Sequence, residues 1–330
     1  MSLRQQVGAL LYDWPRFRRS LRGGRWPLMH NRNERITAGA RGVRCEWRFT
    51  SDLHIAKVFP ALGGRLFDAA FAEWPVVLRE APEARNEVPD VSFVIGHRGR
   101  ARLPHLLLTL RSIAGQESVP FECIVVEQDA APAIERDLPP WVRYLFTESH
   151  DDYNRAAAFN AGARLARGRV LILHDNDIVV PAAYAAKAQV RVVGGFSFAD
   201  LKRFLFYLDE EQTQHAFASG VIAPAVISTV MQNAQGGSIA AEREAYFAIG
   251  GFDDAFIGWG GEDNDFWDRA ATTNRADHFG FLPMIHLHHP PQGGKVLGAE
   301  APAVKLYYER ESIPAEERIR QLIERESHRR

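Results

Sequence analysis

Two carboxylates stand two residues apart directly after an apolar stretch of the chain. Asp175 and Asp177 follow residues 170–173, a run typical of a buried strand, and Asn176 lies between them. Acidic side chains at a strand end can converge on one hard divalent cation such as Mg²⁺ or Mn²⁺, which also binds substrate phosphates. The same short motif closes strands as an Asx-turn, so alone it indicates a metal site only weakly.

Three histidines fall within four positions, at His286, His288 and His289. A lone histidine is usually an ordinary surface or core residue, but a cluster of this kind favours metal binding. Alternating histidines at a strand end would complete a metal site with Asp175 and Asp177. A three-histidine zinc site is the competing interpretation, and the aspartate pair favours a harder ion.

A glycine-rich acidic segment at residues 258–265 reads GWGGEDND. Three glycines around Trp259 are typical of an open, movable loop. Glu262, Asp263 and Asp265 then fall in the first turn of an expected helix, where acidic side chains are favoured. Because that preference does not explain the glycines, we expect a tryptophan lid over a polyhydroxylated substrate. The clustered carboxylates would supply general-base chemistry.

A loop rich in glycine and arginine follows the first expected strand, and it reads GHRGR over residues 96–100. Its glycines let the backbone approach a ligand closely, and Arg98 and Arg100 together could hold a diphosphate. Arginines in a polar loop are usually just solvated, so this signal is weak on its own. The loop is not a G-x-G-x-x-G fingerprint, which disfavours a nicotinamide enzyme.

These groups need strands and helices to position them, and residues 89–181 alternate between the two signals. Four short apolar runs predict strands, at residues 91–95, 121–127, 141–146 and 169–174. Helices are predicted from Pro104 and over residues 153–167, with Gly168 as the C-terminal cap. A further charged helix is expected near residues 314–328. The alternation indicates a parallel sheet covered on both faces, whose ligands bind beyond the carboxyl ends of its strands.

The composition is that of an ordinary globular protein: 330 residues, 46% hydrophobic and 25% charged. Forty basic and 41 acidic residues give a net charge of −1, which disfavours nucleic acid as a partner. Two cysteines are too few for a disulfide scaffold or a four-cysteine zinc site. With no membrane span and no evident secretory signal, we expect a cytoplasmic protein, either soluble or peripheral on the inner face of the membrane.

The first 50 residues carry an excess of positive charge, with eleven arginines against only Asp13, Glu34 and Glu46. Apolar residues recur there at helical spacing from Leu3 onward, and Pro15 would interrupt or restart the helix. One interpretation is an interfacial helix that contacts an anionic membrane. The other is a helix that packs on the main domain and exposes its arginines to solvent.

Five short segments follow one another in a characteristic order. They are VSFVIGHRGR at 91–100, YNRAAAFNAG at 153–162, LHDNDIVVP at 173–181, GGS at 236–238 and GGFDDAFIGWGGEDND at 250–265. Together they resemble the nucleotide-sugar glycosyltransferases of GT-A fold. The most similar group is the galactosyltransferase-like one, with the β-1,4-galactosyltransferases and the bacterial family 2 polysaccharide transferases. The resemblance covers about residues 89–295 and is most specific where GWGGEDND combines with the Asp-x-Asp motif.

The resemblance implies which positions bind the nucleotide and the metal. The positions that match the nucleotide and diphosphate contacts are His97, Arg98, Arg100 and Arg155. Asp175 and Asp177 match the metal-binding pair, with Asp177 the more direct ligand. The distance from the preceding strand favours His286 as a further ligand, followed by His288 and then His289.

The resemblance also implies the parts that face the sugar and the acceptor. Gly237 matches a donor-facing Gly-Gly turn, and Trp259 matches the lid tryptophan. Glu262 matches an acceptor-binding acid and Asp263 the catalytic base. Related retaining transferases carry asparagine at the position of Asp263, so the aspartate favours inversion of configuration.

The sequence thus predicts an α/β protein of GT-A fold, with a Rossmann-like, mostly parallel central sheet and helices on both faces. Its expected parts are an Arg-rich N-terminal extension over 1–85, a GT-A glycosyltransferase domain over 86–300 and a charged helix over 301–330.

The expected activity is an inverting sugar transfer that depends on Mn²⁺ or Mg²⁺. The donor is a UDP-sugar of the UDP-Gal, UDP-GalNAc or UDP-GlcNAc type, and the acceptor is a glycan or lipid-linked glycan in polysaccharide synthesis. Two alternatives stay open: a sugar-1-phosphate nucleotidyltransferase, or a non-catalytic carbohydrate-binding protein on a transferase fold.

Overall fold

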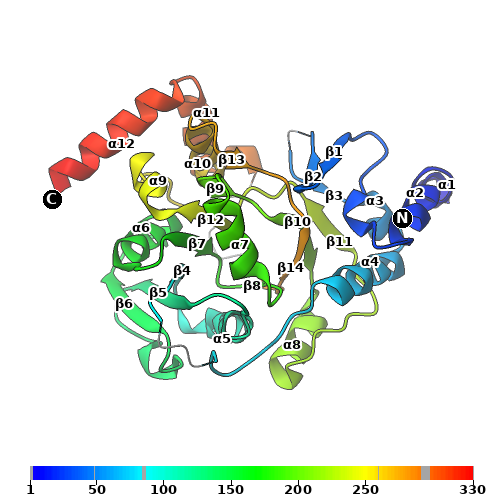
Figure 1. Ribbon diagram of the computed structural model, residues 1–330, viewed down its shortest axis with the longest axis horizontal. Coiled ribbons are helices and arrows are strands. Elements are labelled where there is room, and N and C mark those ends of the chain that lie inside the picture. Colours follow the sequence, from blue (N-terminus) through cyan, green and yellow to red (C-terminus); the bar gives the residue numbers. More distant parts are fainter. Residues whose placement is uncertain (1–2, 48, 84–86, 259, 291–297, 330) are drawn as a thin grey trace.

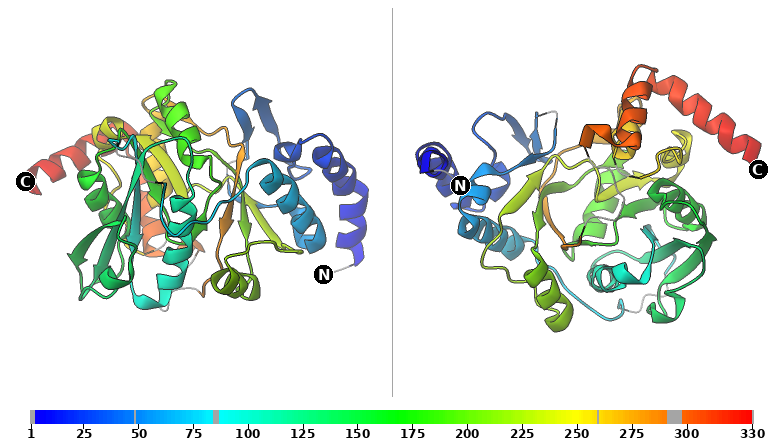
Figure 2. Two further views of the ribbon diagram at one scale, coloured as in Figure 1. Left: turned by 60° about the horizontal axis from the view of Figure 1, so that its bottom comes forward. Right: turned by 180° about the vertical axis from the view of Figure 1, so that it is seen from behind.

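The computed structural model of this chain describes residues 3–47, 49–83, 87–258, 260–290 and 298–329. The described residues form a seven-stranded sheet, a five-stranded sheet and a two-stranded hairpin, with helices packed around them (Figure 1). The N-terminal helices lie at one end of the molecule and the C-terminal helix at the other (Figure 2). Among the helices of this described part, none is long and apolar enough to cross a lipid bilayer.

The seven-stranded sheet contains the strands that the sequence predicts. In order across the sheet they are β13 (Ala276–Asp277), β9 (Phe198–Ala199), β12 (Ser238–Glu242), β7 (Val170–His174), β4 (Val91–His97), β5 (Phe121–Asp129) and β6 (Arg143–Glu148). Strand β4 pairs in parallel with β5 and β7, and β5 pairs in parallel with β6. Strand β12 runs antiparallel to both of its neighbours. The expected mostly parallel central sheet is therefore confirmed.

Helices cover both faces of this sheet, because its central strands are apolar on both sides. The helices around it are α5 (Leu103–Ala114), α6 (Arg155–Leu165), α7 (Tyr184–Val193), α9 (Arg243–Ala248) and α10 (Glu262–Ala271). On β4, Phe93 packs in one core cluster with side chains of α5 and α7. Val94, the next residue, packs on the other side with side chains of α6, α9 and α10. Successive side chains of a strand point to opposite faces of the sheet, so β4 contributes to a hydrophobic core on each face.

A five-stranded sheet that the sequence did not indicate stands beside the first. Its strands, in order, are β3 (Ser51–Asp52), β11 (Thr229–Gln232), β10 (Lys202–Tyr207), β14 (Leu282–His286) and β8 (Ile178–Val179). Two further helices accompany it, α4 (Pro60–Glu73) and α8 (Glu210–Ser219). Helix α4 packs on this sheet through Phe67, whose ring meets Phe206 of β10 edge-on at 5.5 Å. Its strands come from distant parts of the chain, so no local sequence pattern predicts that they pair.

The N-terminal segment packs against this second sheet. Its elements are α1 (Leu3–Gly8), a π-helical turn η1 (Ala9–Asp13), α2 (Trp14–Leu21), η2 (Trp26–Leu28), β1 (Ile36–Gly39), β2 (Gly42–Cys45) and α3 (His54–Val58). Pro15 occupies the first turn of α2 and restarts the helix, as expected. Phe17 and Trp26 are buried in one core cluster with Phe204 of β10. This part of the chain therefore shares a core with the sheet.

The C-terminal part consists of η5 (Gly298–Glu300), α11 (Pro302–Glu311) and α12 (Ala315–Arg329). Two short 3₁₀ turns lie much earlier in the chain, η3 (Arg100–Arg102) before α5 and η4 (Glu135–Asp137) between β5 and β6. The helix expected near 314–328 is confirmed. It is more than a solvated element, because buried Arg318 contacts Asp265 of α10 at 2.6 Å.

Gly168 has a different role from the helix cap that the sequence predicts. Helix α6 ends at Leu165, and Gly168 lies beyond its cap. A Cβ at Gly168 would lie 2.8 Å from the backbone nitrogen of Ser92. Glycine is thus needed for close packing of this turn on β4, and not for a left-handed cap.

Candidate active site

The loop after β7 carries the Asp-x-Asp motif to a place where the two larger sheets meet. The backbone N–H of Asp175 donates to the carbonyl of Gly237 at 2.9 Å, which ties the loop to the turn before β12. Strand β8 then pairs with β14, so Ile178 lies opposite His286. The N–H of Leu287 donates to the carbonyl of Asp177 at 2.9 Å. This pairing brings a motif and a cluster more than 100 positions apart into contact.

Asp177, His286 and His289 form a group whose ligand atoms all lie within 4.8 Å of one another. The distance to Oδ2 of Asp177 is 3.3 Å from Nε2 of His289 and 3.9 Å from Nε2 of His286. Nδ1 of His289 lies 2.9 Å from the carbonyl of Pro290. With its proton donated there, His289 turns the lone pair of Nε2 toward Asp177, as metal-binding histidines do.

The protonation of this cluster suits a cation. Burial lowers the pKa of both His286 and His289, so both rings are neutral near neutral pH. Burial alone would raise the pKa of Asp177, but His286 and Arg102 lower it below its usual range. A carboxylate and two neutral imidazoles are the protonation states that metal binding requires.

Two of the four expected metal ligands, Asp175 and His288, lie outside this cluster, and His289 lies in it. Asp175 instead pairs with Arg155 at 2.6 Å. His288 is left out because β14 ends at His286, so the strand alternation that would place 286 and 288 on one face stops there. The N–H of His288 instead donates to Oγ1 of Thr213 at 2.8 Å.

Arg102 is the arginine of the first loop that reaches the cluster, and sequence reasoning missed it. Its Nη2 donates to Oδ2 of Asp177 and lies 3.4 Å from Oδ1 of Asn176. The signal was present, since Arg102 is the third arginine of the run that begins at Arg98. The guanidinium beside an Asp-x-Asp motif is placed to hold a phosphate by paired hydrogen bonds.

The other residues of this loop have local partners. Arg98 donates to the carbonyl of Asp151, and Arg100 lies 2.8 Å from Asp137. His97 is buried, and its Nε2 lies 3.0 Å from the carbonyl of Gly99. Burial lowers the pKa of His97 to about 4, so its ring is neutral. Nucleotide contacts by these side chains stay a prediction.

Arg155 is the residue that joins the Asp-x-Asp motif, through Asp175, to the acidic helix α10. It begins α6, whose first turn is capped by the side chain of Asn154. Nε of Arg155 lies 2.6 Å from Oδ1 of Asp175, and Nη1 lies 2.8 Å from Oδ1 of Asp263 and 3.5 Å from Oε1 of Glu262. Its Nη2 is buried with no hydrogen-bond partner among the described residues.

Asp263 lies against the Gly236–Gly237 turn, where the sequence places a donor-facing contact. A Cβ at Gly236 would lie 2.2 Å from Oδ2 of Asp263, so a side chain at this position would displace that carboxylate. The carbonyl of Gly237 in the same turn accepts from the backbone N–H of Asp175. The turn therefore contacts both acidic segments.

Burial separates the roles of the acids around Arg155. Burial, reinforced by neighbouring Asp263, raises the pKa of Glu262. Burial also raises the pKa of Asp175, although Arg155 opposes it. Asp265 is different: it is 1% exposed and lies 2.8 Å from Arg269, so it holds the helix in place. Trp259, the expected lid, lies outside the described residues.

Two family models match successive parts of the chain. The model of glycosyl transferase family 2 matches residues 93–219, which include Arg102, Arg155 and the Asp-x-Asp motif. The model described as the N-terminal domain of galactosyltransferase matches residues 222–285, which include the Gly-Gly turn and Asp263. This chain carries glycosyltransferase family domains in a GT-A fold. The recognition made from its motifs and the fold class expected from them are confirmed.

A solved structure similar to this chain is that of GalNAc-T7 with UDP, GalNAc and Mn²⁺. The two chains are 16% identical, with a TM-score of 0.48, and the match covers 68% of this chain and 48% of the other. The chain thus spans about half the length of that protein. No curated protein matches it.

Proposed function

We propose that this glycosyltransferase moves a sugar from a UDP-sugar to a hydroxyl of a glycan or lipid-linked glycan, with a divalent cation and with inversion of configuration. One observation carries the proposal. Arg155 links the Asp-x-Asp motif to the acidic helix α10, because it contacts both Asp175 and Asp263. Asp177 of the same motif lies in the cluster with His286 and His289. A leaving-group site and a proton acceptor are the two parts that an inverting transfer needs.

The donor set fits a divalent metal. It offers one carboxylate oxygen and two imidazole nitrogens. Carboxylates suit both Mn²⁺ and Mg²⁺, and the two imidazoles favour the transition metal Mn²⁺ over Mg²⁺, which prefers oxygen. Asp177, His286 and His289 would hold the ion. When bound, it neutralises the charge that develops on the leaving diphosphate.

The chain's own residues supply the remaining functions. Arg102 lies beside Asp177 and would donate to the diphosphate oxygens. Asp263 would take the proton of the acceptor hydroxyl. At the same time the hydroxyl oxygen would attack the anomeric carbon of the sugar, and the bond between that carbon and UDP would break. Glu262, whose pKa burial raises, would donate a hydrogen bond to the acceptor in its protonated form. Trp259 would close over the sugar.

The donor is expected to be of the UDP-Gal, UDP-GalNAc or UDP-GlcNAc type. The test is UDP release from a panel of these sugars with Mn²⁺, with and without EDTA. Release that requires both Mn²⁺ and an acceptor supports the proposal. Equal release in EDTA would contradict the role of the metal, and no release from any UDP-sugar would contradict the donor class. Calorimetry with UDP checks the same point, because Asp175 and Asp177 alone would repel a diphosphate.

A further inference from the structure

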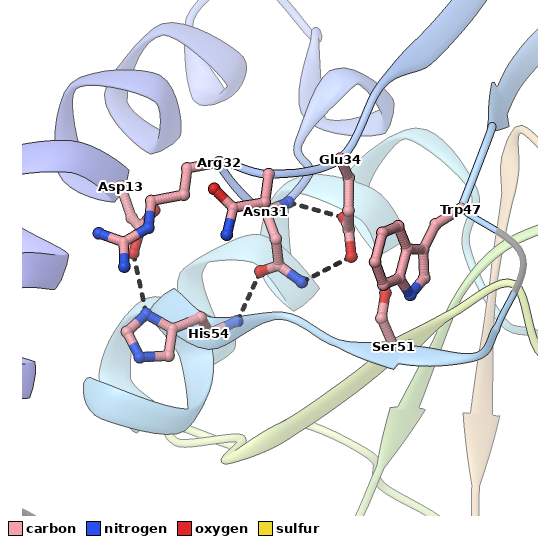
Figure 3. Close-up of a pocket in the computed structure, with 8 residues that line it drawn as sticks. Asp13, Asn31, Arg32, Glu34, Trp47, Ser51 and His54 are labelled. Atoms are coloured by element: carbon pink, nitrogen blue, oxygen red, sulfur yellow. Dashed lines mark hydrogen bonds and ion pairs between the residues drawn. The ribbon is translucent and has the colours of Figure 1, made fainter.

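A cavity of about 340 Å³ opens in the N-terminal segment, outside both family matches (Figure 3). Its walls come from two short stretches of chain and the helix turn before them. The lining side chains are those of Asp13, Asn31, Arg32, Asn33, Glu34, Trp47, Ser51 and His54. Nothing in the proposed transfer chemistry uses these residues, so the cavity needs its own account.

A network of hydrogen bonds holds the floor of the cavity in place. Asn31 donates to Glu34 from both its backbone nitrogen and its Nδ2, each at 2.9 Å. The N–H of His54 donates to Oδ1 of Asn31 at 2.8 Å, and Nδ1 of His54 lies 2.9 Å from Asp13. Asp13 and Glu34 are both buried. Side chains locked in this way form a site that exists before a ligand arrives.

The side chains around the cavity have the chemistry of a sugar site. Figure 3 shows Trp47 beside Glu34 and Ser51 at one end, with Arg32, Asp13 and His54 at the other. Trp47 is 48% exposed, so its ring is open to a ligand. A sugar presents an apolar C–H face that packs on an aromatic ring, and hydroxyls that both donate and accept hydrogen bonds.

Charge narrows the class of ligand. The lining side chains include two buried carboxylates, Asp13 and Glu34, and one exposed cation, Arg32. A phosphate or a nucleotide would meet repulsion from those carboxylates. A neutral polyhydroxylated ligand would not, and it would find acceptors and donors of both kinds.

A short segment, residues 232–236, connects the cavity to the surroundings of Asp263, the proposed base. Gln232, at the end of β11, donates to Glu34 and to Oγ of Ser51, the latter at 3.0 Å. The next residue, Asn233, donates from Nδ2 to the backbone carbonyl of Trp47 at 3.0 Å. Three positions later Gly236 lies against Asp263. Four residues of extended chain span at most about 14 Å, the reach of a short oligosaccharide.

We propose that this cavity is a distal acceptor site, which binds a neutral sugar unit of the acceptor glycan while another unit presents its hydroxyl to Asp263. The inference rests on the proposed function, because it takes the acceptor to be a glycan. It also gives the N-terminal segment a part in acceptor choice, since each side chain of the cavity lies between residues 13 and 54.

The test is binding of the full chain to an array of immobilised neutral oligosaccharides of two to six units. We expect the chain to retain a subset of them. Trp47→Ala should weaken this binding about tenfold, and Trp47→Phe should restore most of it. Trp47 is half exposed, so its truncation leaves the core intact. The matched control is Tyr308→Ala, which removes an exposed ring on α11 and should bind as the wild type does.

The outcomes separate this inference from the function on which it rests. Retention that Trp47→Ala does not change, or no retention by the wild type, overturns the distal site. Retention that depends on Trp47 supports the sugar site even if no UDP-sugar is consumed, in which case the proposed transfer fails alone. Where transfer occurs, Trp47→Ala should raise the KM of long acceptors and leave that of the donor unchanged.

Discussion

At the residue scale, one guanidinium contacts carboxylates from two parts of the chain. Arg155 contacts Asp175, which we propose faces the nucleotide, and Asp263, which we propose acts on the acceptor. The positive charge of Arg155 favours the ionised form of these partly buried carboxylates, because an unpaired buried carboxylate would take up a proton. Asp263 also lies against Gly236, and it is the acid that we propose accepts the proton of the acceptor.

Asp263→Asn should keep UDP binding and lose sugar transfer. The amide has the shape of the carboxylate but cannot accept a proton, and removal of a general base costs on the order of a hundredfold or more. UDP calorimetry and a transfer assay measure the two properties separately. Asp68→Asn, on the exposed side of α4, is the control and should change neither. Transfer at the wild-type rate in Asp263→Asn would move the base elsewhere, with Glu262 the next candidate.

His289→Ala should weaken Mn²⁺-dependent UDP binding by roughly tenfold or more, the scale expected when a metal site loses a ligand or its support. His288→Ala should have a much smaller effect, because the structure leaves that ring out of the cluster. Titration of UDP into each variant at fixed Mn²⁺ compares them. A larger loss in His288→Ala than in His289→Ala would contradict the cluster as the structure draws it.

Between elements, the contact of α12 with α10 supports the acidic turn of the site. Arg318 on α12 and Arg269 on α10 both bind Asp265, which is buried two residues after Asp263. The helix that carries the expected base is therefore anchored by a helix from the end of the chain. The pairing of β8 with β14 anchors the metal-type cluster in the same way.

Arg318→Ala should lower the free energy of unfolding by about 1.5–3 kcal/mol, the usual worth of a hydrogen bond to a charged group. Arg269 still pairs with Asp265, so the loss should stay below that of an isolated buried charge. Urea unfolding provides the measurement. Arg320→Ala removes an exposed pair with Glu317 on the same helix and should cost less than about 1 kcal/mol. Equal losses in the two variants would show that the buried contact is not special.

Stability of the whole molecule should fall as the pH drops below neutral. Burial lowers the pKa of His97 and of His174 to about 4 in the folded chain, against an ordinary value of 6.5. Between these two pH values the histidine is protonated in the unfolded chain but not in the folded chain. The contribution of each histidine to the free energy of unfolding is therefore complete above pH 6.5 and is lost as the pH falls from 6.5 to about 4.

At pH 5 each such histidine should remove about 2 kcal/mol relative to pH 7.5. Urea unfolding at the two pH values measures the loss, and His97→Gln should reduce it by removing one titrating group. An unchanged pH dependence in His97→Gln would show that its ring is protonated equally in both states.

The N-terminal helix leaves the molecule with an apolar surface next to exposed arginines. Leu3 is 76% exposed and Leu11 is 64% exposed, whereas Phe17 is buried in the core. Arg18 and Arg19 are exposed on the same segment. Packing on the second sheet therefore accounts for part of this helix, and contact with an anionic membrane stays a prediction for the rest.

Leu10→Ser combined with Leu11→Ser should abolish binding to anionic vesicles without unfolding the chain, since both side chains are exposed. Each arginine near such a surface contributes about 1 kcal/mol before screening, so binding of the wild type should also fall with salt. Co-sedimentation with phosphatidylserine vesicles is the measurement, and phosphatidylcholine vesicles are the control. No sedimentation of the wild type at low salt would contradict membrane contact.

The sequence by itself determined the central sheet and most of the acidic site. Local signals sufficed there: apolar runs bounded by turn residues predict β4, β5, β6 and β7, and acids placed at strand or helix ends follow them directly. Asp175, Asp177 and Asp263 were identified because each lies in a short motif. Such a motif needs only its own neighbours to be recognised.

Tertiary structure alone decided which partners these residues meet. The five-stranded sheet is made of strands from five separate stretches, so its pairing depends on contacts that no local pattern encodes. That sheet selects His289 over His288, and the turn before α5 brings Arg102 to Asp177. The cavity beneath Trp47 arises for the same reason, because its walls come together only when the N-terminal segment packs on β11.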